Sequence, residues 1–215
     1  MKLTPFFALL RHAPAGPVFN PWYDHDAGTD RSPAAPAGRR ARLRAHLDCP
    51  ARLILVGEGA GYQGCHVSGV AFTSERLLLA GVIPRIHVAG RLSSRARPWS
   101  EPSATTVWGA LEELELAERT VLWNCFPWHP HRPGELQSNR TPTRAEYALG
   151  LPVLDALCAL FPDAEVVAVG KGAHAGLSAL GRRVHCVRHP SMGGASAFRA
   201  GLADWARRQH GRSRL

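Results

Sequence analysis

The sequence lacks the tight cluster of cysteines and histidines, and the long apolar runs, that would indicate a metal-binding or membrane protein. Its five cysteines are widely spaced, with no Cys-x-x-Cys pair, so no zinc site is expected. An odd number of cysteines without a disulfide framework is typical of a reducing compartment. The apolar segment 6–10 is too short to span a membrane and ends at Arg11 and His12. We therefore expect a cytoplasmic protein with no signal peptide, metal or cofactor.

Lysine is also scarce, and acidic residues are outnumbered by basic ones. Lys2 and Lys171 are the only lysines, yet 26 Lys and Arg against 17 Asp and Glu give a net charge of +9. A basic balance of this size favours a polyanionic partner, because phosphate contacts release counterions. An arginine-rich composition is also typical of GC-rich genomes. At 215 residues without an internal repeat, the chain is long enough for one well-buried domain.

Apolar strands alternate with helical segments along the chain. We predict strands at 53–56, 121–124, 165–169 and 184–187, and helices at 1–12, 39–47, 74–80, 105–118, 143–160 and 195–208. This alternation predicts an α/β domain with a central four-stranded parallel sheet and helices on both faces. Thr105 or Thr106 is expected to cap its helix. Thr143 and Glu146 have the spacing of a capping box.

The N-terminal region differs in composition from the rest of the chain. We predict a helix and irregular arm over 1–40 packed on the domain, the α/β domain over 41–210, and a tail over 211–215. Segment 13–40 is rich in Pro, Gly and Ala. Within it, Phe19, Trp22 and Tyr23 are interpreted as packing the arm onto the domain. The alternative is that they form a wall of the binding site.

Three polar segments follow three of the predicted strands. Gly57-Glu58-Gly59-Ala60-Gly61 ends the first strand, Asn124 ends the second, and His189-Pro190-Ser191 follows the last. Ligands of open α/β sheets bind outside the carboxyl ends of the strands. A carboxylate, a carboxamide and an imidazole are thus expected to meet at one edge. For Glu58 alone, a solvated turn is an equally good interpretation.

In order and spacing, these three segments resemble the uracil-DNA glycosylase superfamily, over roughly residues 50 to 200. The resemblance implies a DNA repair glycosylase with that superfamily's fold. Such an enzyme flips a base out of the DNA stack. It then hydrolyses the N-glycosidic bond of uracil, or of another deaminated base, and leaves an abasic site. Some members carry a four-cysteine iron–sulfur cluster, which is not expected here because the close cysteine pair is absent.

The resemblance also assigns roles to individual residues. Glu58 is expected to orient water and stabilise the cationic sugar, since glycoside cleavage passes through an oxocarbenium-like state. His189 is expected to donate to the departing base. Asn124 would read the base edge, and Phe72 would stack on the base. The expected catalytic residues are Glu58 and His189, and the expected base-binding residues are Gly59, Ala60, Phe72 and Asn124.

Contacts to the DNA backbone are expected from two loops. Ser191 would hold a phosphate, and Gly193 would offer an N–H group. Met192 would either wedge into the vacated duplex position or pack as a surface side chain against the loop. In the Pro- and His-bearing loop 126–142, either the basic side chains contact phosphates or the loop tip is solvated. The basic residues in question are His129, His131, Arg132 and Arg140.

The chain departs from the family pattern at three positions. Gly59 stands where one branch has a catalytic Asp, and Gly61 where that branch has a Tyr that excludes the thymine methyl group. Asn139 stands where another branch has a His that links covalently to the abasic sugar, so we expect turnover rather than trapping. The departures leave open a preference for hypoxanthine or a mismatched base.

Two other functional classes remain open from the sequence. One is a non-catalytic module that binds damaged DNA or a nucleotide, and the other is a nucleoside hydrolase. The net charge of +9 favours DNA as the partner. We expect a monomer that acts on DNA without a membrane or a cofactor.

Overall fold

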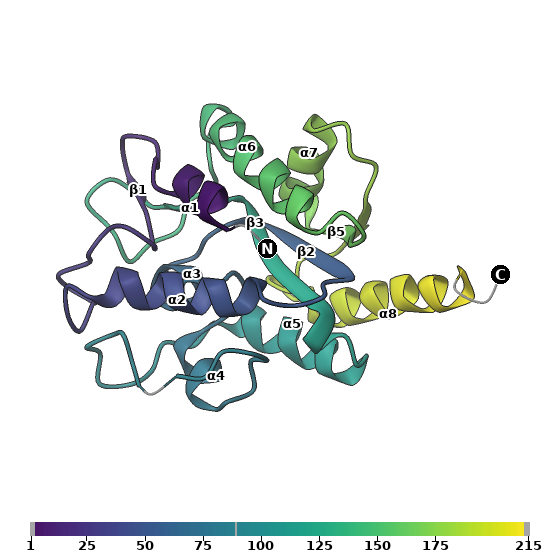
Figure 1. Ribbon diagram of the computed structural model, residues 1–215, viewed down its shortest axis with the longest axis horizontal. Coiled ribbons are helices and arrows are strands. Elements are labelled where there is room, and N and C mark those ends of the chain that lie inside the picture. The colour runs from purple at the N-terminus through teal and green to yellow at the C-terminus, as the bar shows by residue number, and fades with distance from the viewer. Residues whose placement is uncertain (1–2, 89, 213–215) are drawn as a thin grey trace.

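The computed structural model describes residues 3–88 and 90–212. A central sheet is covered by helices on both faces (Figure 1). The strands are β1 (Val18–Phe19), β2 (Leu53–Gly59), β3 (Thr120–Phe126), β4 (His129–Pro130), β5 (Glu165–Val169) and β6 (His185–Val187). The helices are α1 (Thr4–Leu10), α2 (Ala35–Leu47), α3 (Cys65–Ser68), α4 (Glu75–Leu79), α5 (Pro102–Glu113), the 3-10 turn η1 (Ala117–Arg119), α6 (Arg144–Leu160), α7 (Lys171–Ala179) and α8 (Ala195–Arg212).

The main sheet has four parallel strands in the order β3-β2-β5-β6. The predicted fold class is therefore confirmed. The register pairs Gly57 with Asn124 and Gly59 with Phe126. Because β2 and β3 run in the same direction, Glu58 and Asn124 emerge at the same edge of the sheet.

Successive side chains along a strand point to opposite faces of the sheet, which divides the core into two layers. In β2, Ile54 and Val56 pack into a cluster with α1, α6 and α7, whereas Leu53 and Leu55 pack into a cluster with α4, α5 and α8. Figure 1 shows the same division, with α1, α6 and α7 on one side and α4, α5 and α8 on the other. All four side chains are at most 1% exposed, as expected for a parallel strand covered on both faces.

The arm before α2 packs on the domain. Phe19 is 5% exposed and Trp22 is fully buried. The Trp22 ring stacks on Trp123 with centroids 5.7 Å apart, and its Nε1–H donates to the Gly69 carbonyl at 3.0 Å. Through these contacts Trp22 packs against the domain. Helix α2 runs across the predicted boundary at residue 40, and the predicted tail 211–215 lies partly in α8 and partly outside the described residues.

The observed start of one helix agrees with the start predicted from the sequence, and that of another does not. The capping box of α6 is present, with the Glu146 N–H donating to Thr143 Oγ1 at 3.2 Å and the Thr143 N–H to Glu146 Oε2 at 2.7 Å. The prediction that Thr105 or Thr106 caps α5 was wrong. The helix begins at Pro102, because proline's fixed φ and missing N–H suit the first helical position.

Candidate active site

A cavity of about 1550 Å³ opens at the carboxyl ends of the parallel strands. It lies where β2, β3, β5 and β6 end, which is the edge predicted from the sequence. All ten predicted site residues line this one cavity: Glu58, Gly59, Ala60, Phe72, Asn124, Arg140, His189, Ser191, Met192 and Gly193. The fold therefore brings together residues that lie up to 135 positions apart in the sequence, from Glu58 to Gly193.

Glu58 projects from the end of β2 and is held from two sides. The phenol of Tyr147, from the first turn of α6, donates to Glu58 Oε1 at 2.8 Å. Burial, and after it the Glu58 carboxylate, raises the pKa of Tyr147, so the phenol stays protonated and remains a donor. Gly172 of α7 lies so close that an added Cβ would come within 2.0 Å of Glu58 Oε1. These contacts fix one carboxylate oxygen and leave Oε2 for a ligand or water.

Gly57 explains how an amide and an aromatic ring reach the same point. A Cβ at this position would lie 2.7 Å from Asn124 Oδ1 and 2.6 Å from Phe72 Cζ. Only glycine leaves room for both side chains against the strand backbone. Asn124 and Phe72 are 5% and 6% exposed, and Phe72 has a left-handed φ of 48°. An amide and a ring thus meet at the cavity wall, as a planar heterocycle would require.

His189 has a defined hydrogen-bonding state. The Ser191 backbone N–H donates to His189 Nδ1 at 3.1 Å, and the Ser191 hydroxyl lies 2.7 Å from the same atom. Because Nδ1 accepts, a neutral ring carries its proton on Nε2. Burial lowers the pKa of His189, with Glu58 acting in the opposite direction and Arg188 in the same one. The neutral ring therefore offers Nε2–H as a donor.

The segment after His189 is shaped for the rim of the cavity. Met192 is 91% exposed and has a φ of 52°, and Gly193 follows with a φ of 73°. Two consecutive left-handed residues turn the chain sharply. Met192 therefore projects from the rim into solvent. The sequence did not reveal that the Ser191 hydroxyl faces His189.

Arg140 is engaged within the protein. Its guanidinium donates to both carboxylate oxygens of Glu146, at 2.7 and 2.6 Å, and its Nε donates to the His131 carbonyl at 2.9 Å. The side chain is 20% exposed. Arg140 therefore ties the long loop to the start of α6, and any phosphate contact would have to compete with Glu146.

The prediction that His129 contacts phosphates or lies at a solvated loop tip was wrong. Its ring is buried, with Nε2 2.8 Å from the Ser138 carbonyl and Nδ1 2.9 Å from His66 Nδ1. His66 Nε2 in turn lies 3.0 Å from Asp26 Oδ2. Burial, and next the neighbouring His66, lowers the pKa of His129 to about 3. The loop is thus anchored from inside by a chain of hydrogen bonds.

Two residues that shape the site escaped the sequence analysis: Tyr147, which donates to Glu58, and Glu101. Tyr147 was not distinguished from the other residues of its helix, although it follows the capping-box Glu146. Glu101 lines the cavity just before α5, and burial raises its pKa to about 7. Neither residue belongs to a motif, so only the folded arrangement reveals them.

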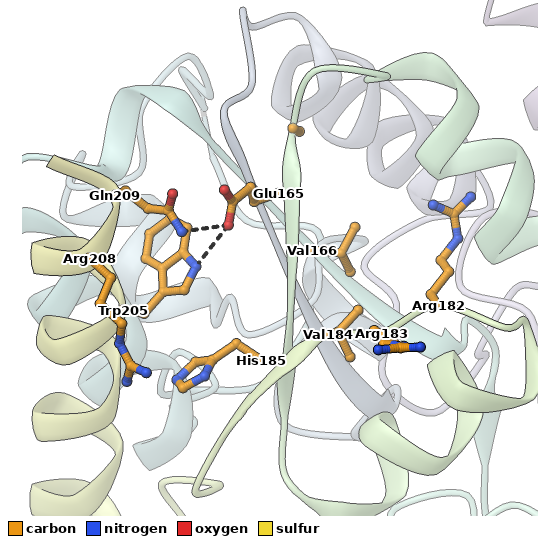
Figure 2. A pocket seen from close by; sticks show the side chains of 10 residues that line it. Glu165, Val166, Arg182, Arg183, Val184, His185, Trp205, Arg208 and Gln209 are labelled. Atoms are coloured by element: carbon orange, nitrogen blue, oxygen red, sulfur yellow. Dashed lines mark hydrogen bonds between the residues drawn. The ribbon is translucent and has the colours of Figure 1, made fainter. Parts of the chain in front are cut away.

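A second cavity, of about 690 Å³, lies at the opposite end of the sheet. Figure 2 shows it beside Glu165 and His185, at the starts of β5 and β6, where Glu165 accepts from Trp205 at 3.2 Å and Gln209 at 2.6 Å. None of the ten predicted site residues lines it.

Within residues 3–88 and 90–212, no three His, Cys, Asp or Glu side chains cluster to hold a metal ion, and no helix is long and apolar enough to cross a membrane.

Comparisons with known proteins identify the family and the fold of the chain. The sequence profile described as "Uracil DNA glycosylase superfamily" matches residues 45–206, well over half of the chain. The fold is similar to the crystal structure of wild-type SMUG2 from Pedobacter heparinus, with a TM-score of 0.64 and 15% sequence identity. That alignment covers 95% of this chain and 92% of the other. Comparison with curated protein sequences gives no match.

Proposed function

Because the chain belongs to the uracil-DNA glycosylase superfamily, we propose that it is a monofunctional DNA glycosylase. It hydrolyses the N-glycosidic bond of uracil, or of another deaminated base, in DNA. The products are the free base and an abasic site. The observation that carries the proposal is the single cavity in which Glu58, Asn124, Phe72 and His189 meet at the carboxyl edge of the sheet.

In this mechanism the flipped base enters the cavity and stacks on Phe72. Asn124 is 5% exposed, so its amide is oriented before the base arrives, and it presents both a donor and an acceptor. Gly59 and Ala60 line the same cavity, and their backbone N–H groups are assigned to a base carbonyl. Ser191, Met192 and Gly193 are assigned to the DNA backbone at the rim.

Bond cleavage requires charge stabilisation on both sides of the glycosidic bond. As the C1′–N bond breaks, its electron pair goes to the base, and the His189 Nε2–H donates to the oxygen that becomes negative. Removing such a donor typically lowers the rate by about 100-fold or more. Glu58 Oε2 faces the sugar cation and accepts a proton from the attacking water, whose oxygen forms the new bond to C1′.

The test is base release from labelled oligonucleotides. Single- and double-stranded DNA containing uracil, hypoxanthine, xanthine or a G·T mismatch is incubated with the protein and then treated with alkali, which cleaves at abasic sites. We expect strand breaks with at least one base, lost in Glu58→Gln and His189→Ala. Glu112→Gln and His174→Ala are the matched controls, since both side chains are exposed outside the cavity.

Three results would contradict the proposal. Tight binding to the same DNA without breaks would indicate a non-catalytic recognition module. Near-normal turnover in both Glu58→Gln and His189→Ala would place the chemistry elsewhere. A covalent adduct that survives a denaturing gel would show trapping of the sugar instead of turnover.

A further inference from the structure

Three arginines gather on the surface of helices α1 and α2 and of the arm between them. The Cζ atoms of Arg11 and Arg40 lie 5.1 and 4.9 Å from the centre of the Tyr23 ring, and Arg44 Cζ lies 4.7 Å from the centre of the Phe7 ring. Both helices pack into the same core cluster, and Figure 1 shows them as neighbours. We call Arg11, Arg40 and Arg44 the arginine patch.

The arginine patch has no acidic counterpart. None of its three side chains forms an ion pair within residues 3–88 and 90–212, although several other arginines of the protein contact a carboxylate. Neither α1 nor α2 contains Asp or Glu. Like charges held close together repel one another, so the binding of an anion would stabilise this arrangement.

The aromatic rings hold the guanidinium groups in place while leaving them accessible. Arg11 and Arg44 are exposed, and Arg40 is half-buried. A guanidinium is attracted to the face of an aromatic ring. The Tyr23 ring is itself fixed, since its phenol donates to the Phe7 carbonyl at 2.9 Å. The arginines therefore lose less conformational freedom when an anion binds.

The spacing of the patch suits a nucleic-acid backbone. Arg40 and Arg44 are four residues apart on α2, which is about 6 Å along the helix axis. One strand of DNA carries a phosphate about every 3.4 Å along its axis, so the two arginines span close to two phosphate steps. Guanidinium groups also match the geometry of phosphate oxygens, to which they donate two parallel hydrogen bonds.

The arm connects the patch with the rim of the candidate active site. The Pro17 carbonyl accepts from Arg140 Nη2 at 3.2 Å, and Arg140 lines the cavity. Arg11 and Tyr23 are each six residues from Pro17 in the sequence, hence at most about 20 Å away at about 3.3 Å per residue. A duplex rises about 3.4 Å per base pair, so this distance corresponds to about six base pairs. DNA bound at the cavity can therefore reach the patch with its flank.

We propose that the arginine patch binds the phosphate backbone of the duplex on one side of the flipped base. This role rests on the proposed function, which brings DNA to the cavity. An acidic protein would offer carboxylates to the same arginines, but only DNA is held at the cavity by the proposed function. The patch lengthens the contact with DNA and makes the affinity more dependent on salt.

The test is the salt dependence of DNA binding. A labelled duplex of about three helical turns with a central uracil is titrated by fluorescence anisotropy at about 50 to 200 mM salt. Glu58→Gln is the background, so that the DNA stays intact. The combined Arg11→Gln, Arg40→Gln and Arg44→Gln variant should lower the slope of log K against log [salt] by about 2 to 3, since each phosphate contact contributes about 0.9. Replacement of the same arginines by Lys should retain most of the slope, because the charge stays.

The matched control replaces Arg182, Arg183 and Arg208 by Gln. It removes the same net charge beside the second cavity, at the end of the sheet opposite the active site (Figure 2), and should change the slope little. Because Arg40 also donates to the Trp22 carbonyl, Arg11→Gln alone guards against a folding defect. This single variant should lower the slope by about 0.9.

Two further duplexes locate the contact. One carries the uracil near its 5′ end and the other near its 3′ end, and the combined variant should lose slope with only one of them. Equal losses with both would overturn the proposal, as would an equal loss in the control variant. So would an unchanged slope in both the combined variant and Arg11→Gln. An unchanged slope together with lost binding to polyglutamate would assign the patch to an acidic protein instead.

Base release is measured separately, in the protein without the Glu58→Gln substitution. If uracil is not released but the slopes change as expected, the proposed function fails and the role of the arginine patch stands. If the protein binds no DNA, both fail.

Discussion

The phenol of Tyr147 donates a 2.8 Å hydrogen bond to Glu58 Oε1. The two residues are 89 positions apart, and the bond joins the start of α6 to the end of β2. It leaves Glu58 with one committed and one free oxygen. In the proposed mechanism the free oxygen orients the water, so the orientation of the carboxylate depends on Tyr147.

Tyr147→Phe should therefore lower kcat about tenfold while the dissociation constant for substrate DNA changes less than twofold. A hydrogen bond to a charged group contributes roughly 1.5–3 kcal/mol, and 1.36 kcal/mol corresponds to a factor of ten in rate. Single-turnover kinetics and fluorescence anisotropy measure the two quantities. Tyr23→Phe is the control, because the Tyr23 phenol donates to the Phe7 carbonyl at 2.9 Å, remote from Glu58. Equal losses in both variants would mean that Tyr147 only stabilises the fold.

A second prediction concerns the backbone against which Glu58 rests. In Gly172→Ala the new methyl group would overlap Glu58 Oε1, at 2.0 Å, and the carboxylate must turn away. Activity should fall about 10- to 100-fold, since small misplacements of a catalytic group have effects of this size. The melting temperature should stay the same or rise, because alanine favours helix α7 by up to about 1 kcal/mol over glycine.

The control for this variant is Gly109→Ala within α5. There the added Cβ meets only the flexible end of Arg199, at 3.2 Å. Its activity should remain near that of the wild type. Full activity in Gly172→Ala would show that Glu58 does not need its present orientation.

The sequence predicted the sheet and the residues at its edge because both depend on local patterns. Apolar runs mark the buried strands, and the polar residues after them must lie at the carboxyl edge, so Glu58 and Asn124 could be placed in advance. Tyr147 and Glu101 could not, since only the fold brings Tyr147 to Glu58 and Glu101 into the cavity wall. His129 was misjudged because its partners His66 and Asp26 are 63 and 103 residues away, and prolines and arginines beside it suggested an exposed loop.

The buried chain from Asp26 through His66 to His129 gives a third prediction. His129→Ala leaves the Ser138 carbonyl and His66 Nδ1 without their partner. The free energy of unfolding should fall by about 2–4 kcal/mol, the combined effect of unpaired polar groups and a cavity. Hydrogen exchange should become faster in the loop 131–141, which includes Asn139 and Arg140. His131→Ala, on the outer side of the same loop, should change both quantities little. Unchanged exchange in His129→Ala would mean that the Arg140 ion pair alone holds the loop.

A fourth prediction is that acid destabilises the protein through the buried His46. Burial, and next the charge of Arg85, lowers the pKa of His46 to about 3, while its Nε2 accepts the Leu122 N–H at 2.8 Å. In the unfolded chain a histidine has a pKa near 6.5. As the pH falls, the unfolded state therefore binds this proton before the folded state does. The contribution of His46 to stability is fully present above pH 6.5 and is lost as the pH falls toward 3.

His46 should add about 1.4 kcal/mol per pH unit to the slope of unfolding free energy between roughly pH 6 and 3.5. His46→Gln keeps an acceptor for the Leu122 N–H and removes the titration, so it should reduce the slope by one proton. Urea unfolding at a series of pH values measures this slope. His174→Gln, at an exposed position on α7, should leave it unchanged. An unaltered slope in His46→Gln would contradict this prediction. It would mean that His46 is already protonated in the folded protein and therefore does not accept the Leu122 N–H.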